Sequence, residues 1–210
     1  MKTTGLLFGL LLIWAVGCKP AGESETSNLE LPILGERYVD DNQDTVYHTI
    51  AQFSFVNQVG DTISNADVSG KVYVADFFFT TCPTICPVMK KEMLRVHEKF
   101  KDNPNFKILS HSIDPTHDTQ EVLKDYADKL EITDASTWNF LTGDQEKIFE
   151  MGQTSYLTTA MADQMEPGGF LHSGAFLLID QQGRIRGVYD GTKSDQVDRL
   201  INDIPKILTP

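Results

Sequence analysis

Two cysteines four positions apart, Cys82 and Cys86, are the residues of this sequence whose types and spacing are best suited to chemistry. A nearly continuous β-branched and aromatic run at residues 71–79 precedes them, and apolar residues at helical spacing follow them. These patterns predict a buried strand leading into a helix, with both thiols at the junction. Because the dipole and unpaired N–H groups of a helix N-terminus favour anions, we expect exposed thiols that ionise more readily than free cysteine.

The spacing of the two thiols permits two kinds of chemistry. In a helix, residues four apart are separated by a rise of about 6 Å and share one face. That separation is within the reach of a disulfide, and it also lets two sulfur atoms converge on one ion. A purely structural disulfide would close a very short loop and stabilise the fold little. We therefore expect Cys82 and Cys86 to be a redox couple or metal ligands.

Most soft metals need a third ligand, and the sequence offers five histidines. His172 is the best placed, because it closes a long segment without periodicity (residues 152–171) and directly precedes an apolar strand. His48 lies in a polar segment without an evident partner, and His97 fits the exposed face of a helix. His111 ends a strand, where we expect an edge or a core position, and His117 is in the loop after that strand.

Two sulfur atoms and one imidazole are a donor set that suits copper. Thiolates select Cu(I), and imidazole binds copper in both oxidation states. Zinc is the competing metal for such a set, with water in a fourth position. No glutamate is placed as the base that zinc-dependent hydrolysis would need.

The rest of the chain predicts the elements that position these side chains. A capping box at Asp118 is expected to start one helix, and Ser194 to cap the last helix, which Pro205 bends or ends. Periodicity predicts the full order: hairpin (52–64), strand (71–79), helix after Cys86, strand (106–113), helix after Asp118, short strand (138–141), short helix (144–151), hairpin (174–180 with 185–189) and final helix.

This order predicts the fold class. A βαβ unit followed by a hairpin and a closing helix is the thioredoxin-type pattern. We therefore expect an α/β, thioredoxin-like fold with an added N-terminal β-hairpin. Residues 152–171 have no clear period, and so long a segment in a compact domain is expected to be a functional loop.

The N-terminus has the pattern of a bacterial lipoprotein. A lysine precedes an apolar run at residues 6–14, which is too short to span a bilayer but suits a signal peptide, and Ala-Val-Gly-Cys18 follows it. We expect a signal peptide over residues 1–17, a lipid on Cys18, a polar tether over residues 18–33, and the copper-binding domain over residues 34–210. The domain would then be held on the extracytoplasmic side of a membrane in the cell envelope, an oxidising compartment.

Composition excludes several classes of protein. The chain has 210 residues, of which 40% are hydrophobic and 23% charged, which is unlike a disordered chain or a multi-span membrane protein. Its formal net charge of −12 excludes a basic nucleic-acid binder. With three cysteines it is not a disulfide-built scaffold.

Three motifs together resemble the Sco/SenC family. They are FFFTTCPTICP at residues 77–87, SIDPTHDT at residues 112–119, and His172-Ser before a strand. Leu171 departs from the family pattern, in which many members have an acidic residue before this histidine. The resemblance covers roughly residues 34–207, and it implies a thioredoxin-like fold that binds copper through Cys82, Cys86 and His172.

The resemblance also implies a role. A Sco/SenC protein would deliver copper, as Cu(I) or Cu(II), to the binuclear copper centre of cytochrome c oxidase, or prepare the thiols of that centre. The expected partners are the copper-bearing subunit of the oxidase, other copper chaperones, and a membrane through the lipid anchor. We expect a copper metallochaperone rather than an enzyme.

A thiol–disulfide oxidoreductase acting on partner cysteines is the alternative hypothesis, with Cys82 and Cys86 as its catalytic pair. Against it, the spacing is CxxxC rather than CxxC, and no proline immediately precedes the strand at residue 174. A thiol peroxidase fits less well, because the threonines before Cys82 are not spaced as in peroxidases of this fold.

Overall fold

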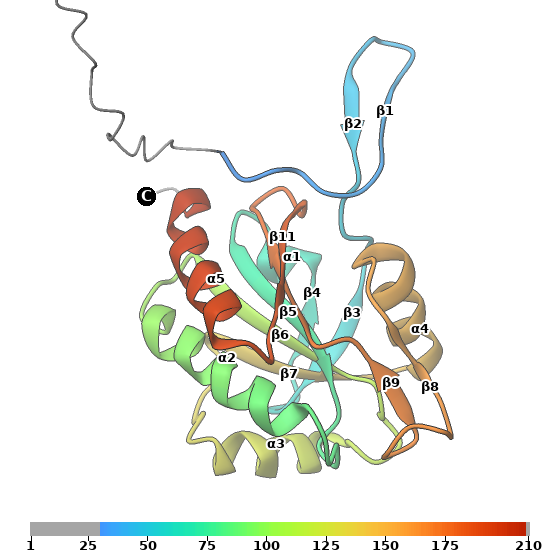
Figure 1. Cartoon of the computed structure of the whole chain (residues 1–210), viewed down its shortest axis with the longest axis vertical. Coiled ribbons are helices and arrows are strands. Elements are labelled where there is room, and N and C mark those ends of the chain that lie inside the picture. The colour runs from blue at the N-terminus through green and yellow to red at the C-terminus, as the bar shows by residue number, and fades with distance from the viewer. Residues whose placement is uncertain (1–29, 209–210) are drawn as a thin grey trace, which may run out of the picture.

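The computed structural model describes residues 30–208 (Figure 1). Its centre is a seven-stranded sheet in the order β11-β10-β5-β6-β7-β3-β4. The middle strands β5, β6 and β7 run parallel, and the strands outside them pair antiparallel. The strands of this sheet are β3 Ser54–Asn57, β4 Thr62–Ser64, β5 Val72–Phe78, β6 Phe106–Ser112, β7 Trp138–Thr142, β10 Ala175–Ile179 and β11 Ile185–Asp190.

The helices cover this sheet and complete the predicted βαβ unit. They are α1 Asn65–Val68, α2 Cys86–Phe100, α3 Gln120–Lys129, α4 Gln145–Glu150, the π-helix η1 Met151–Ser155, and α5 Ser194–Ile207. Every residue of β5 is buried, as its continuous apolar run predicts for a central strand. Helix α5 packs on β11 and α2, whereas α3 contacts β7 and β3. The expected order of strands and helices, with the hairpin β3–β4 added before β5, is confirmed.

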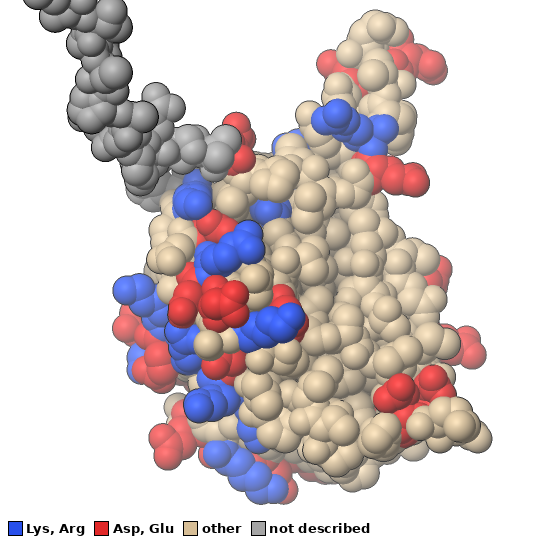
Figure 2. Space-filling view, in the orientation of Figure 1, with Lys and Arg blue, Asp and Glu red and all other residues tan. Residues whose placement is uncertain are grey.

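A second N-terminal hairpin was not predicted from the sequence. Strands β1 Arg37–Val39 and β2 Thr45–Tyr47 form a separate two-stranded sheet that projects from the body (Figure 1). Each strand has only three residues, which is too short for a visible alternation. Charged side chains gather over α5 and α2, whereas the neighbouring face over β11 shows few of them (Figure 2).

Two expected helix caps were wrong, and of the two effects expected of Pro205, ending the helix does not occur. Thr119, rather than Asp118, caps α3, because Asp118 is buried and bonded to other groups. Lys193 precedes α5, and Ser194 is already helical, without a side-chain cap. The helix continues through Pro205 to its end at Ile207, because this proline lies in the last turn and its missing N–H leaves a single carbonyl unbonded.

Residues 152–171 are not the structureless loop that was expected. The segment contains most of η1, strand β8 Ala160–Ala162 and the start of strand β9 Phe170–His172, and the two strands pair as a hairpin. A π-turn followed by three-residue strands gives no period that a sequence window can detect. This hairpin carries His172 at its last position.

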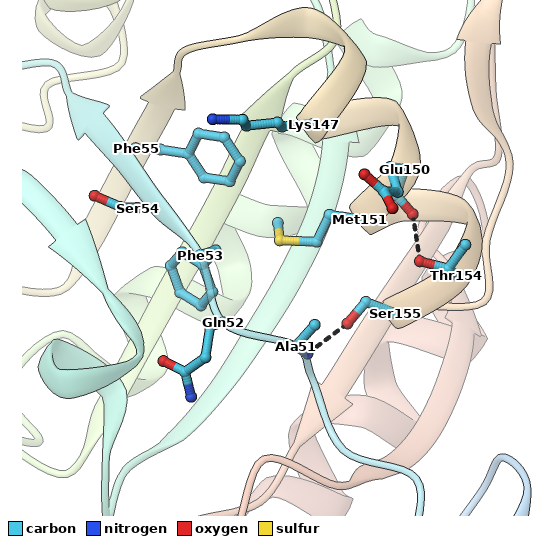
Figure 3. A pocket seen from close by; sticks show the side chains of 10 residues that line it. All are labelled: Ala51, Gln52, Phe53, Ser54, Phe55, Lys147, Glu150, Met151, Thr154 and Ser155. Atoms are coloured by element: carbon cyan, nitrogen blue, oxygen red, sulfur yellow. Dashed lines mark hydrogen bonds between the residues drawn. The ribbon is translucent and has the colours of Figure 1, made fainter.

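The N-terminal segment is tied to η1 beside a cavity of about 520 Å³ (Figure 3). The Ala51 N–H donates to Ser155 Oγ at 2.7 Å, and the His48 ring bonds Ser155 O at 2.6 Å through Nε2. The expectation that His48 has no partner is therefore wrong. Phe53 and Phe55 line the apolar side of this cavity, which no cysteine or histidine lines.

Two further histidines, His97 and His111, pack against aromatic rings, and only His111 lies where it was expected. His97 was expected on an exposed helix face, but it is partly buried and its ring packs 5.6 Å from the Trp138 ring. His111 is a core residue, one of the two places expected for it. Its ring stacks on Phe77, and neither ring nitrogen has a hydrogen-bond partner.

The burial of His111 predicts a measurable pH dependence of stability. Burial lowers the pKa of His111 to about 3, so between pH 6.5 and 3 the unfolded chain binds a proton that the folded chain does not. Stability should therefore fall as the pH falls, by about 2 kcal/mol from this residue between pH 7 and 5. In His111→Leu, the pH-dependent loss measured by urea unfolding should shrink by that amount. The same loss in His111→Leu as in wild type would contradict this reading. In the control His117→Gln the loss should not shrink, because the hydrogen bond with Asp118 raises the pKa of this exposed histidine.

Candidate metal centre

Two sulfur atoms and one ring nitrogen converge at the end of the sheet. Cys82 lies in the turn after β5, Cys86 is the first residue of α2, and His172 ends β9. The His172 Nε2 atom lies 3.8 Å from Cys82 Sγ and 3.3 Å from Cys86 Sγ. Among residues 30–208 these three form the one group of cysteine, histidine or acidic side chains that could hold a metal ion, with ligand atoms within 4.8 Å of one another.

Local interactions fix the two cysteines at the start of the helix. The Cys82 N–H donates to Phe79 O at 3.2 Å, which closes the turn that follows β5. Helix α2 has no side-chain cap, and Pro87 occupies its first turn, where a missing N–H costs no helical hydrogen bond. Only Cys86 is helical, so the two thiols approach each other across the turn and not along one helix face.

The β8–β9 hairpin fixes the histidine. His172 pairs with Ala160 in the hairpin register, and its ring meets the Phe79 ring edge to face with centroids 5.7 Å apart. At the hairpin end, Gly168 has φ +93, and a Cβ there would come within 2.7 Å of the Phe79 side chain. A residue with a side chain at this position would therefore displace the ring that supports His172.

The three side chains are buried, not exposed as the sequence had suggested for the thiols. Their relative exposure is 7% for Cys82, 5% for Cys86 and 7% for His172. Both cysteines are free thiols. Burial therefore leaves little of either cysteine in contact with solvent.

The environment of Cys82 favours its thiolate. Burial opposes ionisation, but hydrogen bonds from His172 and from the hydroxyl and backbone of Thr84, together with the Cys86 N–H, lower the pKa of Cys82 to about 6. The contact with Thr84 Oγ1 is 3.5 Å long. This agrees with the ready ionisation expected of a thiol beside a helix N-terminus.

Cys86 behaves in the opposite way, and the expectation that both thiols ionise readily was wrong for it. Burial raises the pKa of Cys86 far above its usual value, against a hydrogen bond from the Phe79 backbone, and the neighbouring Cys82 and Asp76 raise it further. His172 Nε2 lies nearer to Cys86 than to Cys82, but burial is the largest influence on the pKa of Cys86. The pair therefore has one reactive and one protected sulfur.

The His172 ring is oriented for ligation. Its Nδ1 lies 3.2 Å from the Ser173 carbonyl oxygen, which accepts a hydrogen bond and so fixes the proton on Nδ1. The Nε2 atom then faces the two sulfur atoms. It offers its lone pair to a metal ion when the ring is neutral, and it donates a hydrogen bond to the Cys82 sulfur when the ring carries a second proton. A backbone carbonyl behind a ligating histidine is the usual device for fixing its tautomer and orientation.

The donor set fits a soft metal ion. Zinc, a first-row ion, binds thiolate at about 2.3 Å and imidazole at about 2.0 Å, which sets such ligand atoms roughly 3.5–4 Å apart. The separations of 3.8 and 3.3 Å between nitrogen and sulfur are close to that range. Two thiolates and an imidazole, without a carboxylate, favour Cu(I) over hard cations.

Asp118 positions the cysteine turn, a role that sequence reasoning missed. It is fully buried, and it accepts hydrogen bonds from the Thr80 N–H at 3.0 Å and from the Ser112 hydroxyl at 2.5 Å. It also accepts bonds from the Thr80 hydroxyl and, at 3.0 Å, from the exposed His117 ring. The carboxylate thereby joins the end of β6 to the residues that lead into Cys82.

Removing this carboxylate should destabilise the fold. Asp118→Ala leaves a buried N–H and two hydroxyl groups without their acceptor, and we expect a loss of about 2–4 kcal/mol in the free energy of unfolding. Urea unfolding of the reduced protein measures it. Asp114→Ala, at a partly buried aspartate of the same loop, is the matched control and should lose less than about 1 kcal/mol. Equal losses in both variants would show that Asp118 has no special role.

Comparison with known proteins agrees with this geometry. The sequence profile of SCO1/SenC matches residues 41–209. The chain belongs to the SCO1/SenC family. A Sco relative, the SCO1 protein homolog of Bacillus subtilis, is 31% identical over 169 residues, which cover 80% of this chain and 86% of the relative.

Solved Sco structures share the fold. A SCO1/SenC family lipoprotein from Bacillus anthracis is 32% identical with a TM-score of 0.69, over 77% of this chain and 96% of that chain. BsSco, described with a disulfide switch and as a member of the Sco family of cytochrome c oxidase assembly proteins, is 30% identical with a TM-score of 0.67, over 77% and 95%. The predicted thioredoxin-like fold is thereby confirmed.

Proposed function

We propose that this Sco protein is a copper carrier that binds copper through Cys82, Cys86 and His172 and delivers it to the binuclear copper centre of cytochrome c oxidase. The observation that carries the proposal is the convergence of two sulfur atoms and one imidazole nitrogen, all within 4.8 Å. A ScoI protein of Bradyrhizobium japonicum has been solved with copper bound; it shares this fold with a TM-score of 0.63 and 23% identity over 76% of this chain and 99% of that chain.

The donor set suits a cargo that must be held and then released. Thiolates favour Cu(I), and the imidazole ligand suits either oxidation state. Three ligands leave a coordination position for a ligand of the receiving protein. His172 is on a short hairpin, whereas Cys86 is the first residue of a long helix and Cys82 lies in the turn before it, so the imidazole is the ligand that exchange would displace first.

The second part of the proposal concerns the cellular location of the domain and its membrane anchor. We infer that residues 1–17 are a signal peptide and that a lipid on Cys18 tethers the domain to the extracytoplasmic side of a membrane; these positions lie outside the described residues. The description of the Bacillus anthracis relative as a lipoprotein supports this. Within residues 30–208, no helix has the length and apolar character that crossing a membrane requires.

A thiol–disulfide reductase is the second candidate, and the unequal thiols favour it. The Cys82 thiolate would attack one sulfur of a partner disulfide and release the other as a thiolate. Cys86 would then lose its proton and attack Cys82 Sγ, releasing the second partner thiolate. The partner gains two electrons, and this chain ends with a Cys82–Cys86 disulfide.

One experiment tests the proposal and separates the two candidates. In a strain without this gene, cytochrome c oxidase should lack its binuclear copper, and the wild-type gene should restore it. His172→Ala keeps both thiols but removes a copper ligand, so a carrier loses function and a reductase keeps it. Full restoration of oxidase copper by His172→Ala would overturn the carrier proposal in favour of thiol reduction.

A further inference from the structure

An uncharged, partly apolar surface lies on the outer side of the hairpin that carries His172. Leu157 is 52% exposed and Met161 is 42% exposed, and they border a groove of about 460 Å³ whose other lining residues are Gln153, Thr158 and Thr159. We refer to these five residues as the hairpin patch. It has no charged side chain, in a chain whose net charge is −12.

The exposed Leu157 has a strained backbone conformation. Its φ is +54, in the left-handed region that few residues other than glycine, asparagine and aspartate adopt. It lies two residues after the end of the π-helix η1, and such helices are frequent at functional sites. A strained backbone that presents a large apolar side chain to water contributes nothing to the core, which points to a role in binding.

The hairpin patch is joined directly to the metal ligand. The Ser173 N–H donates to Thr159 O at 3.0 Å, and the hydroxyl groups of Thr158 and Ser173 are hydrogen-bonded to each other. Ala160, between the patch residues Thr159 and Met161, pairs with His172 in the hairpin. A protein that contacts the patch therefore acts on the strand beside the His172 backbone.

From this placement we infer that the hairpin patch is the docking surface for the protein that exchanges copper with this chain, an inference that rests on the proposed function. The partner's contact surface is apolar at its centre and basic at its rim, because Asp163 and the exposed Glu166 lie at the end of the same hairpin. Figure 2 shows acidic side chains in the area of this hairpin. Methionine suits such contacts, since its flexible thioether adapts to different surfaces.

Charge argues against the other occupants of the patch. A second copy of this chain would bring its own Asp163 and Glu166 against the first pair, and like charges at an interface are unfavourable. An anionic membrane surface would repel the same two side chains. A basic rim on the partner instead turns both carboxylates into favourable contacts.

Two substitutions remove the apolar contact without disturbing the fold. Leu157→Asn tolerates the left-handed conformation, and Met161→Thr suits an exposed strand position. Both should keep the stability and the equilibrium copper affinity of the wild type. Val56→Thr is the matched control, since Val56 is a 36% exposed strand residue outside the patch.

The test mixes Cu(I)-loaded protein with the reduced, copper-free soluble domain of the copper-bearing oxidase subunit. We expect the double variant to load this domain about tenfold more slowly than the wild type or Val56→Thr, and to give up copper to a small Cu(I) chelator at the wild-type rate. In wild type, adding the domain should shift the methyl NMR signals of Leu157 and Met161.

Each outcome decides between the inference and the function on which it rests. If the wild type loads the domain but the double variant is equally fast, or the Leu157 and Met161 methyl signals do not move, the docking surface is elsewhere and the inference is wrong. If those signals shift but no copper passes, the surface is correct and the proposed delivery to the oxidase fails. If the domain neither binds nor receives copper, both are wrong.

Discussion

Replacing Cys86 by serine is expected to abolish tight copper binding, and replacing His172 by alanine to weaken it at least about tenfold. Each substitution removes one of three converging ligand atoms, and serine offers a hard oxygen where Cu(I) prefers sulfur. Titration of the reduced, metal-free protein with Cu(I) against a competing chelator measures both effects. Wild type should bind one equivalent.

The control for this titration is a histidine outside the centre. His117 is exposed and bonded to Asp118, so His117→Ala should bind copper with wild-type affinity. A His172→Ala variant that competes with the chelator as well as wild type does would remove the imidazole from the ligand set. Loss of affinity in His117→Ala as large as in His172→Ala would point to general disruption of the loop.

The second large effect concerns the reactivity of the two thiols. With its pKa lowered to about 6, Cys82 is mostly thiolate at pH 7, whereas burial keeps Cys86 protonated. Iodoacetamide should therefore modify Cys82 more than about a hundredfold faster than Cys86 at pH 7. The Cys82 rate should fall as the pH falls through about 6, because protonation removes the nucleophile.

Mass spectrometry of the alkylated peptides measures these rates residue by residue. His172→Ala removes a hydrogen-bond donor to the Cys82 sulfur, so the midpoint of its pH profile should move upward. Thr84→Ala removes a weaker donor and should move it less. Equal alkylation rates for both cysteines, or a midpoint near that of free cysteine, would contradict the environment described for this pair.

The strong elements of this fold could be predicted because their signals are long. The fully buried β5 and the apolar stripe of α2 each extend over seven residues or more, so the strand-to-helix junction and its two thiols follow from pattern alone. His172 was placed by the thioredoxin-like order and by resemblance to a family. Its distance from the sulfur atoms, however, depends on a hairpin that periodicity did not reveal.

What could not be predicted depends on long-range contacts. Asp118 has the sequence context of a helix cap, but its bonds to Thr80 and Ser112 exist only because β5 and β6 are neighbours in the sheet. His48 finds its partner 107 residues away, in η1. The high pKa of Cys86 depends on burial between the helix and the sheet, which outweighs the favourable helix N-terminus.

X-ray absorption at the copper edge tests the central claim most directly. Cu(I)-loaded wild type should show two sulfur neighbours and one imidazole nitrogen, and His172→Ala should lose the imidazole contribution while keeping both sulfurs. A wild-type spectrum with one sulfur, or the same imidazole contribution in His172→Ala, would contradict the assignment of Cys82, Cys86 and His172 as the copper ligands.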